Sequence, residues 1–215
     1  MKKAFTMIEL VFVIVVMGIL AAVIIPNTRT NPLQEAALQV VSHIRYTQHL
    51  AMMDDKFNAT DVNWYKKRWQ LIFGNSADTD HKDAYSIFSD DAAVATASNP
   101  NLGELAIDPM SSDKFLSGGT NGSLNFNDSR ANKKMNLGLS YGVTDVIFSG
   151  GCASNTIKRI TFDHLGRPIK NPLHTYIQSY RLGRLITSRC EIILKNSDAN
   201  ITIAVEAETG YAHIL

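Results

Sequence analysis

The most prominent feature of the hydrophobic pattern is a long apolar run close to the N-terminus. Of the 21 residues from Phe5 to Ile25, only Thr6 and Glu9 are polar. A helix of that length extends about 31 Å at ~1.5 Å rise per residue, close to the ~30 Å hydrocarbon core of a bilayer. The pattern predicts a transmembrane helix over residues 5–25. Lys2 and Lys3 before it predict a cytoplasmic N-terminus.

A second helical pattern follows the apolar run. Pro26 is expected to kink or interrupt the helix because it lacks a backbone N–H, and Asn31-Pro32 suit a restart, with Asn as cap. One face then carries apolar residues at helical spacing: Leu33, Ala36, Ala37, Val40, Val41, Ile44 and Ala51. We therefore expect an amphipathic helical half over residues 26–53 that packs on the rest of the chain. An independent membrane-surface helix is the weaker alternative, since the polar face is not Lys-rich.

Beyond Met53 the pattern changes to short alternating runs separated by turn residues. These runs predict strands at 69–73, 85–88, 145–149, 157–162, 190–195, 200–205 and 211–214. Several alternate apolar and polar residues, as strands of a half-solvated antiparallel sheet do. Residues 89–136 are rich in Asp, Asn, Ser and Gly, and we expect a long loop there with room for one short strand. The expected class is α+β, a long N-terminal helix packed on an antiparallel β-sheet domain over residues 54–215.

Composition and charge narrow the class of protein. Apolar residues make up 45% of the 215 residues, charged residues 19%, and the formal net charge is +1. These values exclude a disordered chain and argue against a protein that coats nucleic acid. The charge is segregated, because residues 54–120 carry 6 Lys/Arg against 11 Asp/Glu, whereas residues 151–195 carry 8 against 2. Such segregation either orients the domain against neighbours or reflects ordinary solvated faces.

The chain has two cysteines, Cys152 and Cys190. An even count in a domain exported past a membrane anchor favours one disulfide, worth roughly 3–4 kcal/mol in the chain-entropy model. Two unpaired buried thiols are the alternative. Neither cysteine has a further Cys or His at the spacing of metal ligands, which argues against a metal site. Neither belongs to a CxxC motif, which argues against a thioredoxin-like redox site.

The residues around the start of the apolar run carry the most specific signal. Met1-Lys2-Lys3-Ala4 precedes it, Phe5-Thr6 begins it, and Glu9 is the fifth residue after Ala4. An ordinary secretory signal instead has a shorter apolar run with its cleavage site after it. The string resembles the class III signal of type IV prepilins, with Ala4 where the family usually has glycine. Gly18 and Pro26 also stand where pilins carry these residues, so the resemblance covers residues 1–53.

This resemblance implies how the N-terminus is processed and used. A prepilin peptidase would cut between Ala4 and Phe5, remove residues 1–4 as a leader, and N-methylate the new amine of Phe5. Glu9 would then serve assembly by pairing with the Phe5 amine of a neighbouring subunit. A lone carboxylate in an apolar span costs several kcal/mol, so Glu9 needs a partner or an interface. The alternative is an acid that merely snorkels to the headgroups.

Two strings in the C-terminal half are similar to the GspH/FimT class of pseudopilins. One runs from Ile160 to Pro168 (ITFDHLGRP), and the other is Ile201-Thr202-Ile203 followed by Glu208-Thr209-Gly210-Tyr211. In physical terms Asp163 and Gly166 suit a tight reversal after a strand, and Thr209-Gly210 suits the turn into a final strand.

Signatures of enzymes and ligand sites are weak. The sequence has no HExxH, no GxSxG and no phosphate-binding glycine loop. An acidic loop could hold Ca²⁺ but lacks the pattern of a calcium loop (Asp78, Asp80, Asp83, Asp90 and Asp91). A basic–aromatic set could bind single-stranded nucleic acid, although sheet-surface charges are the commoner explanation (Arg159, Arg167, Arg181, Arg184, Arg189, Tyr176 and Tyr180).

The expected function is that of a minor pseudopilin, a structural subunit of the periplasmic pseudopilus of a type II secretion system. The resemblance implies a single-pass protein of the bacterial inner membrane with its C-terminal domain in the periplasm. Its partners would be other pseudopilins or pilins, the prepilin peptidase and the inner-membrane assembly platform. We expect no catalysis, no cofactor, no metal site and no nucleic acid. The alternative is a minor pilin of a type IV pilus or competence system, with DNA as a candidate ligand.

Overall fold

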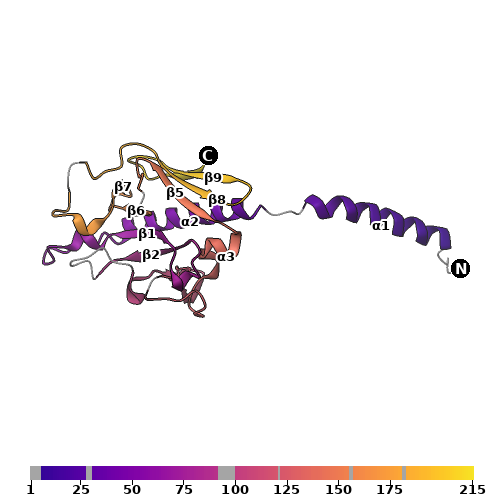
Figure 1. The fold of residues 1–215 in the computed structure, drawn as a ribbon, viewed down its shortest axis with the longest axis horizontal. Helices are drawn as coiled ribbons and strands as arrows, with labels where there is room; N and C mark the ends of the chain where they lie inside the picture. Colours follow the sequence, from indigo (N-terminus) through magenta and orange to yellow (C-terminus); the bar gives the residue numbers. More distant parts are fainter. Residues whose placement is uncertain (1–5, 28–30, 92–99, 121, 155–156, 181–182) are drawn as a thin grey trace. The chain divides into compact units, whose positions relative to one another are not determined.

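The structure, a computed structural model, describes residues 6–27, 31–91, 100–120, 122–154, 157–180 and 183–215, with the backbone alone for residues 21–27. The chain divides into two compact units, Met1–Asn31 and Pro32–Leu215. The first contains helix α1 (Met7–Asn27), and the second begins with helix α2 (Pro32–Met53) and contains the β-sheets. Figure 1 shows these elements along the chain.

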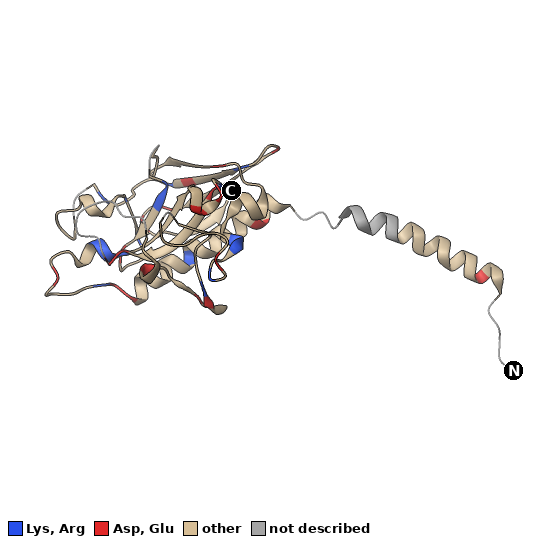
Figure 2. Cartoon of the chain, turned by 60° about the horizontal axis from the view of Figure 1, so that its bottom comes forward, with Lys and Arg blue, Asp and Glu red and all other residues tan. Residues whose placement is uncertain are grey.

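Helix α1 is apolar and has exposed side chains. From Met7 to Leu20 every side chain is exposed, and Glu9 in the first turn is the one charged residue of this stretch. Figure 2 shows the acidic colour there, whereas the rest of the described part of α1 is uncharged. The helix continues through Pro26 and ends at Asn27. Among the residues that the structure describes, no helix is both long enough and apolar enough to cross a membrane.

The second unit is α+β with antiparallel sheets, as expected. Within its described residues the strands form two four-stranded antiparallel sheets and one two-stranded sheet. One has the order β2 (Ala84–Ser89), β1 (Trp69–Gly74), β6 (Arg159–Phe162), β7 (Pro168–Ile169). The other has the order β10 (Ala212–Ile214), β9 (Asn200–Val205), β8 (Cys190–Lys195), β5 (Asp145–Gly150). Every predicted strand is present, with ends that agree to within two residues.

The segment 89–136 contains more regular structure than expected. Strands β3 (Ile107–Asp108) and β4 (Ser111–Phe115) pair with each other, so the expectation of a loop with one short strand was wrong. Both strands are too short and too polar to show an alternating pattern. The segment is held to β2 by the backbone, where Ala106 N donates to Ile87 O at 2.9 Å and Ile87 N donates to Leu116 O at 2.9 Å. Residues 92–99 lie outside the described part of the chain.

Short helical turns connect these strands. They are η1 (Trp64–Lys67), η2 (Ala77–Thr79), η3 (Leu102–Glu104), η4 (Lys133–Met135), α3 (Leu137–Tyr141) and η5 (Leu173–Thr175).

Helix α2 provides the apolar face around which the second unit is built. All seven residues of the predicted face are buried, together with Thr47. The helix contacts β1 and β6 of one sheet and β8, β9 and β10 of the other. One amphipathic helix therefore closes the core between two sheets whose strands come from distant parts of the sequence (Figure 1).

Candidate functional site

Glu9, the predicted assembly residue, caps the N-terminus of α1. Its Oε2 accepts hydrogen bonds from the backbone N of Thr6 at 2.9 Å and from Thr6 Oγ1 at 2.7 Å. Glu9 N lies 3.4 Å from Thr6 Oγ1 in return. This reciprocal arrangement is a capping box, which satisfies backbone donors that the first helical turn leaves unpaired. The Thr6–Glu9 pair thus has a local structural role that the sequence analysis did not anticipate.

The predicted cleavage and methylation site, Ala4 and Phe5, lies outside the described residues. So do the side chains of residues 21–25, the last part of the predicted transmembrane span. Gly18, in the described part of α1, has open space around it, because a Cβ built there would meet no atom within 4 Å.

Cys152 and Cys190 form a disulfide, as the sequence predicted. Cys190 is the fully buried first residue of β8, and it lies opposite Gly150 at the end of β5. Cys152 follows in the turn after β5, which brings the two Cα atoms within 4.9 Å. The disulfide therefore closes one end of a strand pair that is already in register.

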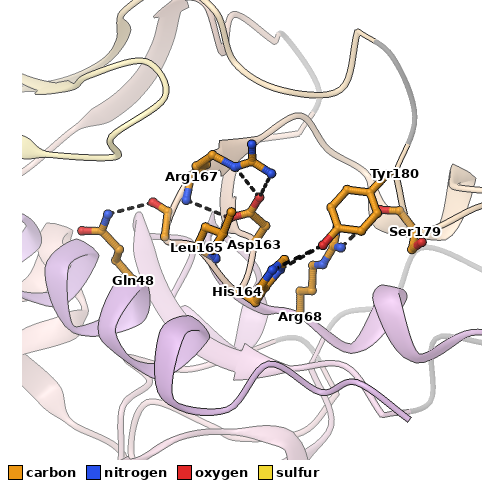
Figure 3. A network of polar contacts seen from close by, with 9 residues as sticks. Gln48, Arg68, Asp163, His164, Leu165, Arg167, Ser179 and Tyr180 are labelled. Atoms are coloured by element: carbon orange, nitrogen blue, oxygen red, sulfur yellow. Dashed lines mark hydrogen bonds and ion pairs between the residues drawn. The ribbon is translucent and has the colours of Figure 1, made fainter. Parts of the chain in front are cut away.

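The two C-terminal strings singled out in the sequence place their turns at the same point of α2, and Figure 3 shows Gln48 of α2 beside the first of these turns. The first contains the turn after β6, where Gly166 has φ +77° and donates from its N to Asp163 O at 2.9 Å. The second contains the turn before β10, where Gly210 has φ +68°. Gln48 of α2 holds both, because its Nε2 donates to Gly166 O and to Thr209 O, each at 2.7 Å. Both predicted turns are confirmed, and their common anchor is Gln48, which lies outside the buried apolar face of α2.

Asp163 organises the first of these turns from the inside. Its side chain is 1% exposed, and Oδ1 accepts from Leu165 N at 3.0 Å and from Arg167 N at 2.9 Å. Oδ2 forms an ion pair with Arg167, whose Nε and Nη2 both lie 2.8 Å away. A buried carboxylate with these partners fixes the turn and also neutralises Arg167.

The acidic residues considered as calcium ligands are not brought together. Asp78 instead holds the segment 122–125. Its Oδ2 accepts a hydrogen bond from Gly122 N at 2.8 Å, and its Oδ1 accepts one from Asn125 Nδ2 at 3.2 Å. Asp83 and Asp90 are buried, and burial raises the pKa of Asp83. Among the described side chains, no three of the types that ligate metals converge on a common point.

The predicted basic–aromatic set divides on folding. Arg159 is buried over the Phe88 ring, and Arg189 forms an ion pair with Glu206 at 2.9 Å, while Arg181 lies outside the described residues. The others line one cleft of about 460 Å³ (Arg167, Arg184, Tyr176 and Tyr180). Arg68, which the sequence analysis did not select, completes it (Figure 3). No signal in the sequence marks Arg68, because the carbonyl to which it donates, Ser179 O, belongs to a residue 111 positions further along the chain.

No protein-family model matches this chain, and no curated protein or solved structure is significantly similar to it.

Proposed function

We propose that this chain is a minor pseudopilin, a structural subunit of the periplasmic pseudopilus of a type II secretion system. The observation that carries the proposal is the N-terminal string, in which a basic tetrapeptide is followed by Phe5-Thr6 and by Glu9 inside an apolar run. Because a carboxylate is rare and costly in such a run, its presence argues for a specific partner.

Three features of the structure support this proposal. Apart from Glu9, the described side chains of α1 are apolar and exposed, so this helix has a large apolar surface that needs cover from lipid or from other helices. Helix α2 lies over two antiparallel sheets with its apolar face buried, which is the role expected for the second half of a pilin helix. The disulfide is in keeping with a domain on the oxidising side of a membrane.

In the proposed mechanism the protein works by assembly. Residues 5–25 anchor the chain in the inner membrane, and the prepilin peptidase removes residues 1–4. The assembly platform then extracts the processed subunit. Glu9 pairs with the Phe5 ammonium of a neighbour, which sets the register of the fibre and compensates a charge that would otherwise be buried in an apolar medium.

Glu9 has two separable properties, and these allow a sharp test. Glu9→Leu removes both the charge and the capping oxygen, whereas Glu9→Gln removes the charge and keeps an oxygen that can accept from Thr6 N. If pairing with a neighbour is the function, both variants insert and are cleaved to a mature protein that begins with N-methylated Phe5. Neither then crosslinks to its fibre neighbours or supports secretion. Mass spectrometry of the N-terminus, crosslinking in membranes and a secretion assay measure these steps.

Glu35→Gln is the matched control. Like Glu9, Glu35 is an exposed acid in the first turn of a helix, but its helix is α2 and not the apolar helix α1. It should assemble and secrete normally. If Glu9→Gln behaves like wild type and Glu9→Leu does not, capping is the whole role of Glu9 and the pairing mechanism is wrong. An intact Met1 in the protein recovered from membranes would contradict the proposal at its first step.

A further inference from the structure

The arginine–tyrosine cleft, made by Arg68, Arg167, Arg184, Tyr176 and Tyr180, contains a buried cation that forms no ion pair with any described residue. Arg68 is 4% exposed, and its guanidinium lies 5.5 Å from the ring centres of both Trp64 and Tyr180. Within the described residues it makes one hydrogen bond, from Nη2 to Ser179 O at 3.2 Å, and its buried Nε has no partner. A guanidinium carries five N–H donors, so most of the capacity of Arg68 is unused.

The other charged groups of the cleft do not compensate Arg68. The one carboxylate in the lining, that of Asp163, forms an ion pair with Arg167 at 2.8 Å. Arg184 stacks over the Tyr176 ring at 4.6 Å and donates to Thr175 Oγ1 at 3.2 Å. The described part of the lining thus has three guanidinium groups and one carboxylate. Because burial without a partner makes a charge expensive, the cleft is electrostatically complementary to an anion.

The walls of the cleft are apolar. Ile169 and Tyr176 are buried, Leu185 is half-buried, and Tyr180 is half-exposed beside Arg68 (Figure 3). The cavity of about 460 Å³ is within the ~300–1,000 Å³ range of ligand pockets. Its size and its walls suit one or two apolar side chains, and Arg68 and Arg184 suit a carboxylate attached to them.

We propose that the arginine–tyrosine cleft binds a peptide segment of a partner protein in which Asp or Glu stands next to a large apolar residue. The carboxylate pairs with Arg68 and Arg184, and the apolar side chain lies against Ile169, Tyr176 and Leu185. A peptide fits better than single-stranded nucleic acid, which requires a series of exposed cations along a groove. Here the central cation is buried, and Arg167 is already neutralised. This site lies in the second unit and is independent of the N-terminal assembly signal.

The test uses the full chain in a non-ionic detergent, with binding followed by ligand-observed NMR. The probes are 3-phenylpropionate, its neutral analogue 3-phenylpropanamide, the blocked dipeptide acetyl-Glu-Phe-amide and an oligothymidine. We expect the dipeptide to bind more tightly than 3-phenylpropionate, and the amide and the oligonucleotide not to bind. Arg68→Met, which keeps an apolar stem between Trp64 and Tyr180, should weaken dipeptide binding at least about tenfold, as should Arg184→Gln at the rim.

Arg189→Gln is the matched control, because Arg189 belongs to the same basic stretch but pairs with Glu206 away from the cleft. It should leave the affinity unchanged. Arg184→Gln keeps the test decisive if Arg68→Met does not fold. The proposal would be overturned if 3-phenylpropanamide bound as tightly as 3-phenylpropionate. It would also be overturned if a folded Arg68→Met or Arg184→Gln variant bound the dipeptide with unchanged affinity. Tighter binding of 3-phenylpropionate than of the dipeptide would assign the cleft to a small carboxylate, and binding of the oligothymidine alone would assign it to nucleic acid.

Discussion

Polar side chains at the edges of the buried face of α2 hold the helix to the β-rich body. Gln48 connects two turns, and Arg45 donates from Nε and Nη2 to Ala212 O at 3.0 and 2.7 Å. Gln39 donates to Lys134 O at 2.9 Å and to the Tyr85 hydroxyl at 2.7 Å. Each of these bonds satisfies a carbonyl or hydroxyl next to the helix, so the polar residues of α2 specify where the surrounding segments dock.

Replacement of Gln48 by alanine should destabilise the second unit. The change removes the side-chain donor of two carbonyl groups, Gly166 O and Thr209 O. Gly166 is buried, whereas Thr209 is exposed. We expect the free energy of unfolding to fall by about 1–2 kcal/mol in urea denaturation. His49→Ala, at the exposed neighbouring position, is the control and should change it by less than about 0.5 kcal/mol. Equal stabilities of the two variants would show that the connection between the turns contributes nothing.

His43 gives the fold a dependence on pH. Gln39 donates to the Tyr85 hydroxyl, and His43 Nδ1 lies 2.7 Å from the same oxygen, where the unprotonated nitrogen of a neutral imidazole can accept the hydroxyl proton. Burial lowers the pKa of His43 below its ordinary value of 6.5, although Asp108 opposes the shift. The unfolded chain therefore binds more protons than the folded chain at pH values just below 6.5, and stability rises with pH in that window.

We expect the free energy of unfolding to fall as the pH is lowered from 7 through 6.5, and this part of the slope to be smaller in His43→Gln. Denaturation curves of both proteins at several pH values between about 5 and 7.5 measure the difference. Identical slopes would mean that His43 titrates normally in the folded protein.

At the scale of elements, the disulfide secures the pairing of β5 with β8. These strands are adjacent in the second sheet, and the intervening chain contains β6, β7 and η5, of which β6 and β7 belong to the other sheet. The link between Cys152 and Cys190 thus closes a loop that leaves one sheet, contributes two strands to the other and returns. A covalent closure of this kind restricts the unfolded chain.

Loss of the disulfide should lower the free energy of unfolding by about 2–5 kcal/mol. Cys152→Ser is the preferred variant, because Cys152 is half-buried whereas Cys190 is fully buried and would bury a hydroxyl. Dithiothreitol should cause a similar loss in the wild-type protein and no further loss in the variant. Free thiols in the untreated wild-type protein would contradict both the pairing and the proposed periplasmic location.

At the scale of the whole molecule, folding reduces the segregation of charge seen along the sequence. The basic stretch 151–195 meets acidic partners from outside it, because Lys158 pairs with Asp145 at 3.0 Å and Arg189 with Glu206 at 2.9 Å. Such partly exposed ion pairs contribute little to stability, so their main effect is on the electrostatic field of the surface. Arg184 of this stretch lies in the arginine–tyrosine cleft together with Arg68, which comes from outside the stretch.

The division into two units predicts that the second folds without the first. The unit Pro32–Leu215 has its own core, made by α2 and the two sheets. A chain that begins at Asn31 should therefore be soluble without detergent. In non-ionic detergent its melting temperature should lie within a few degrees of that of the full chain, as measured by circular dichroism. Loss of cooperative unfolding would show that residues 1–30 are required for this fold.

The features predicted correctly from the sequence are those with a local physical cause. The buried face of α2 follows from a 3.6-residue period, the strands from alternating apolar runs, and the two turns from Asp163, Gly166 and Gly210 in conformations that these residue types favour. The disulfide follows from the number of cysteines and the expected compartment. Strands β3 and β7 escaped prediction because two residues cannot show a period, and β4 escaped it because four of its five residues are polar.

The tertiary structure alone decided which distant segments meet. It placed β6 beside β1 and joined the turns at Gly166 and Gly210 through Gln48. It also brought Arg68 against the ring of Tyr180, which is distant from it in the sequence. None of these contacts has a local signature, because each depends on how the apolar faces of α2 and of the two sheets pack together. The arginine–tyrosine cleft is thus a product of the fold, whereas the proposed N-terminal assembly signal is contained in consecutive residues.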